Sequence, residues 1–151
     1  MTIAAVRRLR RADREDWERL WNAYIRFYRA RVPDEVTEQT FERLCNGAGG
    51  LAGLVAVDGQ DRPIGLARLV FHASTWAKTH YCYLEDLFVD SAHRGGGTAA
   101  RLIDAVYECA RQHGASRVYW LTQQYNGPAR SLYDSVGQLT AFVVYEHRLG
   151  E

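Results

Sequence analysis

The chain has 151 residues, of which 47% are hydrophobic and 25% are charged. A chain of this length buries enough apolar surface to form one domain without a structural metal or a disulfide. The formal net charge of +1 gives no reason to expect a nucleic acid partner. The arginines near the N-terminus are not followed by an apolar run of the length that a signal peptide or a membrane span needs, so we expect a cytoplasmic protein without a membrane partner.

Cysteine and histidine residues give no sign of a metal site. The three cysteines, Cys45, Cys82 and Cys109, are odd in number and widely spaced, and they contain no C-x-x-C pair. The histidines likewise lack the spacing of zinc ligands. We therefore expect reduced thiols and no bound metal.

The first part of the chain predicts one strand followed by two helices. The strand covers Ile3 to Leu9, and Asp13 can cap the first helix. Thr37 can cap the second helix, which ends at Asn46 and Gly47. The apolar residues of the first helix recur at three and four positions, as an amphipathic helix requires: Trp17, Leu20, Trp21, Tyr24, Phe27 and Tyr28.

The rest of the chain alternates strands and helices without a repeat or a linker. Helices are predicted over Thr98 to Gln112 and over Ala129 to Val136, where Pro128 occupies the first turn. The strands predicted here are Leu51 to Val57, Ile64 to His72, Tyr81 to Val89, Val118 to Thr122 and Phe142 to Leu149. The whole pattern predicts a single α/β domain over residues 1–151 with a mixed sheet.

A glycine turn lies between a predicted strand and the longest clear helix. Gly95, Gly96 and Gly97 let the backbone approach a bulky ligand, and the first turn of a helix beginning at Thr98 offers unpaired N–H groups to an anion. Arg94 adds a positive charge. A phosphate group fits such a turn, and the alternative is a flexible turn without function.

Other glycine motifs fit this turn less well. A dinucleotide-binding turn would lie in the first βαβ unit and would need an acidic residue at the end of the next strand, where the chain has none. A Walker loop would need a Gly-Lys-Ser/Thr ending, and an esterase oxyanion loop would need a G-x-S-x-G elbow. Both are absent from the sequence.

Three segments resemble one enzyme superfamily. Val89 to Ala99, with Arg94, Gly97 and Ala99 at matching positions, resembles the coenzyme A signature of the GNAT superfamily of N-acetyltransferases. The segment Asn126 to Tyr133 resembles the second conserved block of that superfamily. Tyr83 to Val89 is similar to the catalytic strand of the diamine (spermidine/spermine) acetyltransferase branch.

The resemblance implies an α/β (α+β) fold with a mixed, mostly antiparallel central sheet that is flanked by helices and splayed between its fourth and fifth strands. It implies acetyl-CoA as the cofactor, coenzyme A as the product and a homodimer. The backbone of Phe88 and Val89 would line the pantetheine arm, which Asn126 would also bind. The loop that would wrap the pyrophosphate consists of Arg94, Gly95, Gly96, Gly97, Thr98 and Ala99.

Acetyl transfer to an amine needs a base, because an alkylammonium group with a pKa near ~10.4 is almost wholly charged at neutral pH. Glu85 is our candidate, since a partly buried carboxylate beside the acceptor could take the proton directly or through a water molecule. The diamine acetyltransferase resemblance implies the same role, and a structural or substrate-orienting carboxylate is the alternative. Asp86 is expected to face the other way, because strand side chains alternate unless a bulge intervenes.

The leaving thiolate benefits from a proton, which a phenol close to the sulfur can give. Tyr133 matches the family spacing from Asn126 and is the candidate acid. Its alternative is a core position, because Ala129, Leu132 and Val136 share its helical face. For Asn126, the alternative is an ordinary N-cap before Pro128.

The candidate residues for the acceptor site are several carboxylates and one tryptophan. Asp34, Glu35 and Glu38 fall in the segment that covers the acceptor in such folds, and Trp76 precedes the catalytic strand. With Asp86 they would suit a cation, although charged residues at a helix start are usually capping or solvated.

The sequence thus predicts an acetyl-CoA-dependent N-acetyltransferase that acts directly on a primary amine, such as a polyamine or another small amine. Protein lysine, amino acids and antibiotic amines stay open as acceptors. The alternative from another class is a non-catalytic acyl-CoA-binding sensor module.

Overall fold

The computed structural model describes Ile3 and residues 5–150. It forms two compact units, Met1–Leu121 and Thr122–Glu151, which are described one after the other. The predicted single domain over residues 1–151 stays a prediction, and Ala4 of the predicted first strand lies outside the described residues.

The first unit is built around one sheet of five strands in the order β1-β2-β3-β4-β5. Its strands are β1 (Ala5–Arg8), β2 (Leu51–Val57), β3 (Pro63–Ala73), β4 (His80–Val89) and β5 (Ala115–Tyr119). The first four pair antiparallel and β4 pairs parallel with β5, which confirms the mixed, mostly antiparallel sheet.

The two last strands of this sheet separate part-way along their length. Pairing between β4 and β5 runs from His80 opposite Ala115 to Tyr83 opposite Tyr119. The chain leaves the strand after Tyr119, while β4 continues to Val89 and stays paired with β3. In the described part of the first unit, the edge of β4 beyond Tyr83 therefore has no strand partner, which is the splay expected from the sequence.

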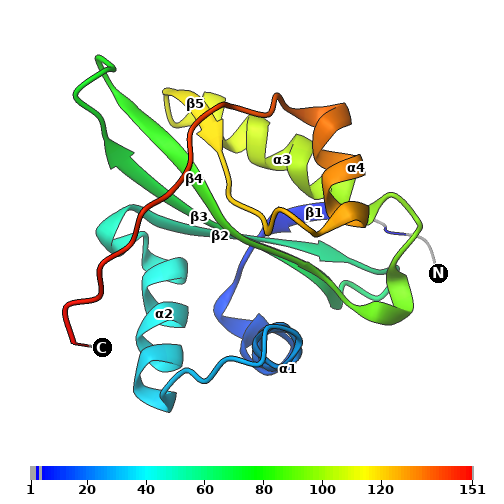
Figure 1. Cartoon of the computed structure of the whole chain (residues 1–151). Helices are drawn as coiled ribbons and strands as arrows, with labels where there is room; N and C mark the ends of the chain where they lie inside the picture. The colour runs from blue at the N-terminus through cyan, green and yellow to red at the C-terminus, as the bar shows by residue number, and fades with distance from the viewer. Residues whose placement is uncertain (1–2, 4, 151) are drawn as a thin grey trace. The chain divides into compact units, whose positions relative to one another are not determined.

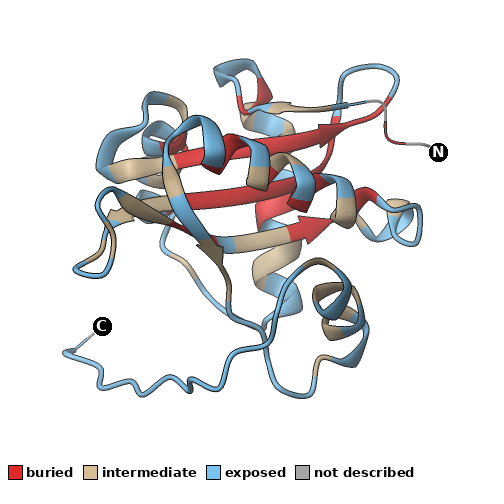
Figure 2. Ribbon diagram, turned by 90° about the horizontal axis from the view of Figure 1, so that it is seen from above, coloured by how far each residue is buried: buried red, intermediate tan, exposed pale blue. Residues whose placement is uncertain are grey.

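Two helices cover one face of the sheet, α1 (Arg14–Phe27) and α2 (Asp34–Asn46), and α3 (Thr98–Gln112) covers the other (Figure 1). The spacing of Trp17, Leu20 and Trp21 places all three on the buried side of α1. They pack with apolar residues of α2, the sheet and the segment that follows β1: Leu9, Phe41, Leu44, Val55, Val57, Leu66 and Phe88. Figure 2 shows that the buried residues concentrate in the strands and the helix faces turned toward them.

The helix α3 has the bounds predicted from the sequence. Leu102, Ile103 and Val106 are completely buried, because their spacing keeps them on the side facing the strands. Gly65 of β3 lies beneath this helix, where a Cβ would meet the Leu102 side chain at 3.2 Å and the Phe88 carbonyl oxygen at 3.1 Å. A glycine is needed there because helix and sheet approach closely.

The predicted cap of the second helix is wrong, whereas Asp13 does occupy the N-cap position of α1, without a side-chain hydrogen bond to that helix. The helix α2 begins at Asp34 after Pro33, so Thr37 lies within the helix and is buried. Its hydroxyl accepts a hydrogen bond from Trp21 Nε1 at 3.2 Å and joins α2 to α1 instead of capping a terminus.

The second unit contains α4 (Gly127–Val136), with the predicted proline in its first turn. The final strand predicted over Phe142 to Leu149 is wrong, because the described residues of this segment form no strand. Phe142 is 89% exposed and Tyr145 is 95% exposed. The pattern does favour extended backbone, but a strand also needs a ladder of hydrogen bonds, and no strand is described within this unit.

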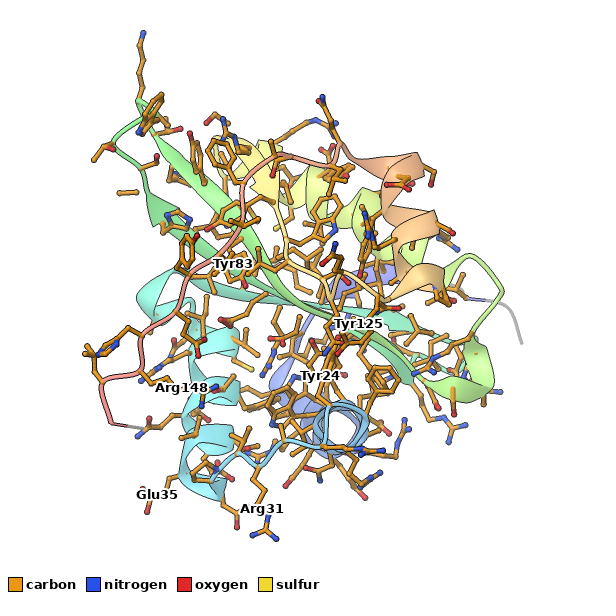
Figure 3. All side chains as sticks on the ribbon, in the orientation of Figure 1. Tyr24, Arg31, Glu35, Tyr83, Tyr125 and Arg148 are labelled. Carbon is orange, nitrogen blue, oxygen red and sulfur yellow. The ribbon has the colours of Figure 1, made fainter. Side chains whose placement is uncertain are left out.

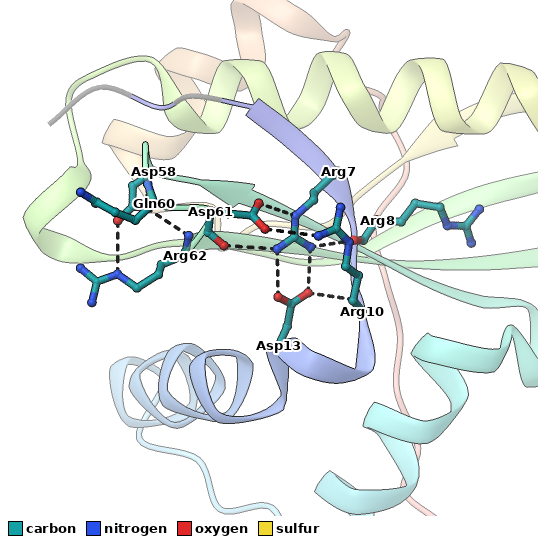
Figure 4. Close-up of polar contacts among 8 residues, drawn as sticks. All are labelled: Arg7, Arg8, Arg10, Asp13, Asp58, Gln60, Asp61 and Arg62. Atoms are coloured by element: carbon teal, nitrogen blue, oxygen red, sulfur yellow. Dashed lines mark hydrogen bonds and ion pairs between the residues drawn. The ribbon is translucent and has the colours of Figure 1, made fainter.

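An ionic network fixes the start of α1 against the sheet (Figure 4). The Asp13 side chain is buried and accepts hydrogen bonds from Arg7 Nη1 at 2.9 Å, Arg7 Nη2 at 3.0 Å and the Arg10 backbone N–H at 2.8 Å. Arg7 also donates from Nε to Asp61 at 2.9 Å. Asp13 thus caps the turn that precedes α1, and makes no side-chain cap to α1 itself.

We predict that Asp13→Asn destabilises the fold by about 3 kcal/mol at pH 7, because it leaves Arg7 without its buried counter-charge. Burial opposes ionisation of Asp13, but the bonds from Arg7 and Arg10 outweigh it and lower the pKa. The contribution is therefore present above the ordinary carboxyl pKa of ~3.9 and is lost as the pH falls through the lowered pKa. Urea unfolding at pH 7 and pH 3 should show a smaller acid loss in the variant than in the wild type.

The matched control is Glu42→Gln, which breaks an ion pair to Arg11 of similar length, 2.8 Å, on the exposed surface. It should change the free energy of unfolding by less than about 1 kcal/mol. Equal effects of the two substitutions at pH 7 would contradict the structural role of Asp13.

Candidate functional site

A β-bulge on β4 positions the two acidic residues singled out from the sequence. Leu69 of β3 lies opposite Leu84, and the preceding Arg68 lies opposite Asp86, so Glu85 is an extra residue on β4. Such an insertion bends the strand and interrupts the alternation of side chains. The bulge adjoins the point where β4 loses its partner β5.

Glu85 is an accessible carboxyl group whose pKa lies above its ordinary value. Its side chain reaches solvent, yet burial of the remainder raises the pKa, and the charge of Asp86 raises it further. The guanidinium of Arg68 acts in the opposite direction. A carboxylate with a raised pKa is a stronger proton acceptor while it is still ionised at neutral pH.

Asp86 is held in an ion pair inside the first unit. Its Oδ2 accepts a hydrogen bond from Arg68 Nε at 2.8 Å and lies 2.6 Å from Arg68 Nη2 in the ion pair. The Asp86 and Arg68 side chains are 12% and 9% exposed. The Arg68 guanidinium carbon lies 3.6 Å from the centre of the Trp21 ring. The expectation that Glu85 and Asp86 face opposite ways rests on regular alternation, which the bulge at Glu85 interrupts.

Two tyrosine side chains lie close enough to the carboxylates for their charge to act on the phenols. Burial raises the pKa of Tyr24 on α1, and the charge of Asp86 adds to the effect. Burial also raises the pKa of Tyr83, followed by the charges of Glu85 and Asp86. Figure 3 labels both residues, Tyr24 on the helix beneath the sheet and Tyr83 on β4. Both phenols therefore stay protonated and can donate hydrogen bonds near the carboxylates.

The glycine turn between β4 and α3 is open. A Cβ built on Gly95, Gly96 or Gly97 would meet nothing within 4 Å. Gly95 and Gly97 have φ values of 85° and 80°, which favour glycine, and no side chain caps α3. The N–H groups of the first turn of α3 are thus left to a ligand.

Residues beside the turn add charge and fix its shape. Arg94 is exposed, and its Nε donates to the Val89 carbonyl at 3.0 Å, so that carbonyl already has a partner. The Phe88 side chain is buried, which leaves only its backbone for a ligand. Thr98 is buried and Ala99 is half-buried at the start of α3. The open turn, the uncapped helix and the Arg94 charge together fit the pyrophosphate of coenzyme A.

The structure does not bring all the predicted acceptor residues to Glu85. Asp34 and Glu35 are exposed in the first turn of α2. Figure 3 shows Glu35 at the end of that helix that points away from the sheet. Trp76 is 90% exposed in the turn beyond Ala73 and His80, where the β3–β4 pairing ends. Of the predicted acceptor residues in the first unit, Asp86 is the one that lies beside Glu85.

Asn126 and Tyr133 belong to the second unit. The Asn126 side chain accepts from the Ala129 N–H at 3.5 Å and is the N-cap of α4, which was its alternative reading. Tyr133 is half-buried on the same helix, and its carbonyl accepts from the Gly137 N–H at 2.8 Å. Their roles toward a cofactor stay predictions.

The thiols of the first unit are poor nucleophiles. Burial raises the pKa of Cys82, which is completely buried, to about 12, and burial also raises the pKa of Cys109 and Cys45. A thiol with so high a pKa carries almost no thiolate at neutral pH. Within the described residues, no group of three or more His, Cys, Asp or Glu side chains could hold a metal ion. No helix of that part of the chain is long and apolar enough to cross a membrane.

Comparison with known proteins identifies the family. Residues 17–138 match the model of the acetyltransferase (GNAT) family. The chain belongs to this family. This confirms the superfamily, the fold and the enzyme class expected from the sequence.

Individual relatives and structures agree with that assignment. The chain is 34% identical over 142 residues to the D-amino-acid N-acetyltransferase HPA3 of Saccharomyces cerevisiae, covering 93% of this chain and 88% of the relative. It is 33% identical over 84 residues to the thialysine N-epsilon-acetyltransferase of Caenorhabditis elegans, covering 56% and 51%. The fold matches the crystal structure of a probable acetyltransferase with a TM-score of 0.85 and 20% identity, over 98% of this chain and 99% of that one.

Sequence reasoning missed Arg68 and its aromatic support. The signal was present, because Arg68 is a lone charge in the otherwise apolar run from Ile64 to Val70. A buried cation in such a strand needs a buried anion. Asp86 is the anion, but the pairing of β3 with β4 depends on a register that the sequence does not reveal.

We predict that Gly96→Val weakens acetyl-CoA binding at least tenfold, because the side chain would fill the open turn where a phosphate would lie. Gly96 lacks the positive φ of its neighbours, so this substitution adds little backbone strain. Calorimetric titration with acetyl-CoA is the measurement.

Gly59→Val is the control, since Gly59 also has open space around its Cβ position but lies in the turn between β2 and β3. It should bind acetyl-CoA as the wild type does. A folded Gly96→Val protein with wild-type affinity would remove the glycine turn from the cofactor site.

Proposed function

We propose that this chain transfers an acetyl group from acetyl-CoA directly to the primary amine of a small molecule, with Glu85 as the general base. Glu85 accepts a proton from the ammonium form of the acceptor, directly or through water, and so exposes the nitrogen lone pair. Acetyl-CoA, held by the glycine turn, supplies the acetyl thioester. No acetyl-enzyme is part of this proposal, because the described cysteine thiols have raised pKa values and Cys82 is buried.

The observation that carries the proposal is the place of Glu85 in the bulge. It is accessible to solvent, its pKa is raised, and it adjoins the part of β4 whose edge has no strand partner among the described residues of the first unit. A ligand in extended conformation can add to such an edge through backbone hydrogen bonds. The same strand would thus line the pantetheine arm with the backbone at Phe88 and Val89, apart from the Val89 carbonyl that Arg94 occupies, and would also carry the base.

For the acceptor, we propose the amine of an amino acid or of a similarly small molecule. The HPA3 relative is named for D-amino acids and the nematode relative for thialysine, and both are N-acetyltransferases. The sequence resemblance to the diamine acetyltransferase branch places polyamines among the alternatives. Trp76, Asp34 and Glu35 stay proposals as acceptor-binding residues. A cytoplasmic location and a homodimer likewise stay proposals. Light scattering on the purified protein tests the oligomeric state.

We predict that Glu85→Gln lowers kcat/KM for the amine by about 100-fold or more at neutral pH and leaves acetyl-CoA affinity unchanged. The defect should shrink as the pH rises toward the amine pKa of ~10.4, because the acceptor then deprotonates by itself. The measurement is acetyl-CoA consumption across a panel of D- and L-amino acids, lysine analogues, polyamines, lysine peptides and aminoglycosides, followed by a pH profile for the best acceptor.

Glu108→Gln is the matched control, since Glu108 is an exposed carboxylate on α3. It should behave as the wild type. An equal loss for Glu85→Gln at every pH would contradict base catalysis, and no turnover with any acceptor in the panel would favour a non-catalytic sensor module.

From the second unit, we propose that Tyr133 gives its phenolic proton to the leaving thiolate and that Asn126 binds the pantetheine arm through the side-chain groups not used in capping. Tyr133→Phe keeps the ring and removes the hydroxyl. We predict a loss of about 100-fold in kcat with little change in thermal stability or acetyl-CoA affinity. Wild-type kcat in a folded variant would leave Tyr133 as a packing residue.

A further inference from the structure

The ion pair between Arg68 and Asp86 lies directly beside the proposed base. Both side chains are largely buried, and two donors of one guanidinium, Nε and Nη2, reach the same carboxylate oxygen at 2.8 and 2.6 Å. The Asp86 charge acts on Glu85, and so does that of Arg68. Next to Glu85, a bound acceptor therefore meets the Asp86 carboxylate, whose charge Arg68 already compensates.

Packing makes this compensation hard to undo. The guanidinium of Arg68 stacks 3.6 Å from the centre of the Trp21 ring, and Trp21 is itself fixed by its hydrogen bond to Thr37 on α2. Moving Arg68 away would leave a buried cation without an anion. Displacing Arg68 from Asp86 by a second ammonium group of the acceptor therefore has a large cost in free energy.

We propose that Arg68 is a specificity-determining residue: by pairing with Asp86 it leaves Glu85 as the uncompensated carboxylate of the pair, so that the site accepts one ammonium group and discriminates against diamines and polyamines. This inference rests on the proposed function, since it concerns the acceptor of the same reaction. It assigns to Arg68 a part in binding selectivity, without contact to the reacting atoms.

Arg68 and Asp86 have opposite effects on the pKa of Glu85. The groups that face it are Asp86 and Tyr83 on β4 and Arg68 on β3, and Tyr24 of α1 acts on Asp86. Removing Arg68 takes away a cation and strengthens the effect of Asp86, so the pKa of Glu85 rises. Removing the Asp86 charge leaves the cation alone, so the pKa of Glu85 falls.

The test compares a linear monoamine with the diamine of the same carbon chain, each as a competitive inhibitor of the best acceptor at neutral pH. In the wild type, the diamine should gain little over the monoamine. In Arg68→Met, the ratio of the two inhibition constants should shift about tenfold or more in favour of the diamine, because Asp86 is released to attract the second ammonium group. The double variant Arg68→Met/Asp86→Asn should return this ratio to the wild-type value.

A second measurement uses the acidic limb of the kcat/KM profile with a monoamine acceptor. The limb should move to higher pH in Arg68→Met and to lower pH in Asp86→Asn. A purely structural role for the pair would lower activity in both variants without these opposite shifts. An unchanged ratio of inhibition constants in Arg68→Met, or the same gain in the double variant, would overturn the proposal.

The proposal can still be tested when one of the single variants does not fold. If Arg68→Met fails to fold because Asp86 is left unpaired, Asp86→Asn still tests the proposal, because it removes the anion of the pair instead of the cation. Its unpaired Arg68 should weaken the monoamine about tenfold and the diamine more than that, and equal weakening of the two would contradict the proposal. The outcome is also separable from the base role of Glu85, because the inhibition constants measure binding and Glu85→Gln measures proton transfer.

Discussion

The one-residue shift in register between β3 and β4 is the constraint on which the proposed site depends. Without it, Glu85 and Asp86 would alternate across the sheet and one of them would point into the face covered by α3. With it, Asp86 lies opposite Arg68 and Glu85 becomes the extra residue, exposed and yet close to both charges. The bulge adjoins the end of the β4–β5 pairing. One strand therefore carries a bent segment with a carboxylate and, within the described residues of the first unit, an edge without a strand partner.

The core beneath the sheet supports this geometry. Trp17 and Trp21 stack with ring centres 6.3 Å apart, and the guanidinium of Arg68 lies over the Trp21 ring. Thr37 of α2 receives the Trp21 N–H, so both helices on this face help to fix the position of Arg68. A cation in a strand interior is costly unless it is paired and packed, and here both conditions are met. The pairing that a buried Arg68 requires thus compensates the charge of Asp86 beside Glu85.

Much of this could be predicted from the sequence, and the exceptions have physical causes. The bounds of α3 follow from periodicity and the glycine turn, and those of β2 from a short apolar run between turn signals. The glycine turn before α3 follows from its motif as well, while the role predicted for Glu85 stays a prediction. The bulge was not predicted, because it exists only in the pairing of β4 with a distant strand. The partner of Asp86, the inner position of Thr37 and the missing strand after Phe142 all depend on such long-range contacts, which local patterns do not specify.

The central claim is that the surroundings of Glu85 at the β4 bulge raise its pKa above the ordinary glutamate value and so make it a stronger proton acceptor. Carbon-13 NMR titration of the Glu85 side-chain carboxyl in the protein without substrate tests it most directly, with Glu85→Gln identifying the resonance. The account predicts a midpoint above the ordinary glutamate pKa of ~4.3. A midpoint at or below that value would contradict the claim, because Glu85 would then be an ordinary surface carboxylate and too weak a base for the proposed step.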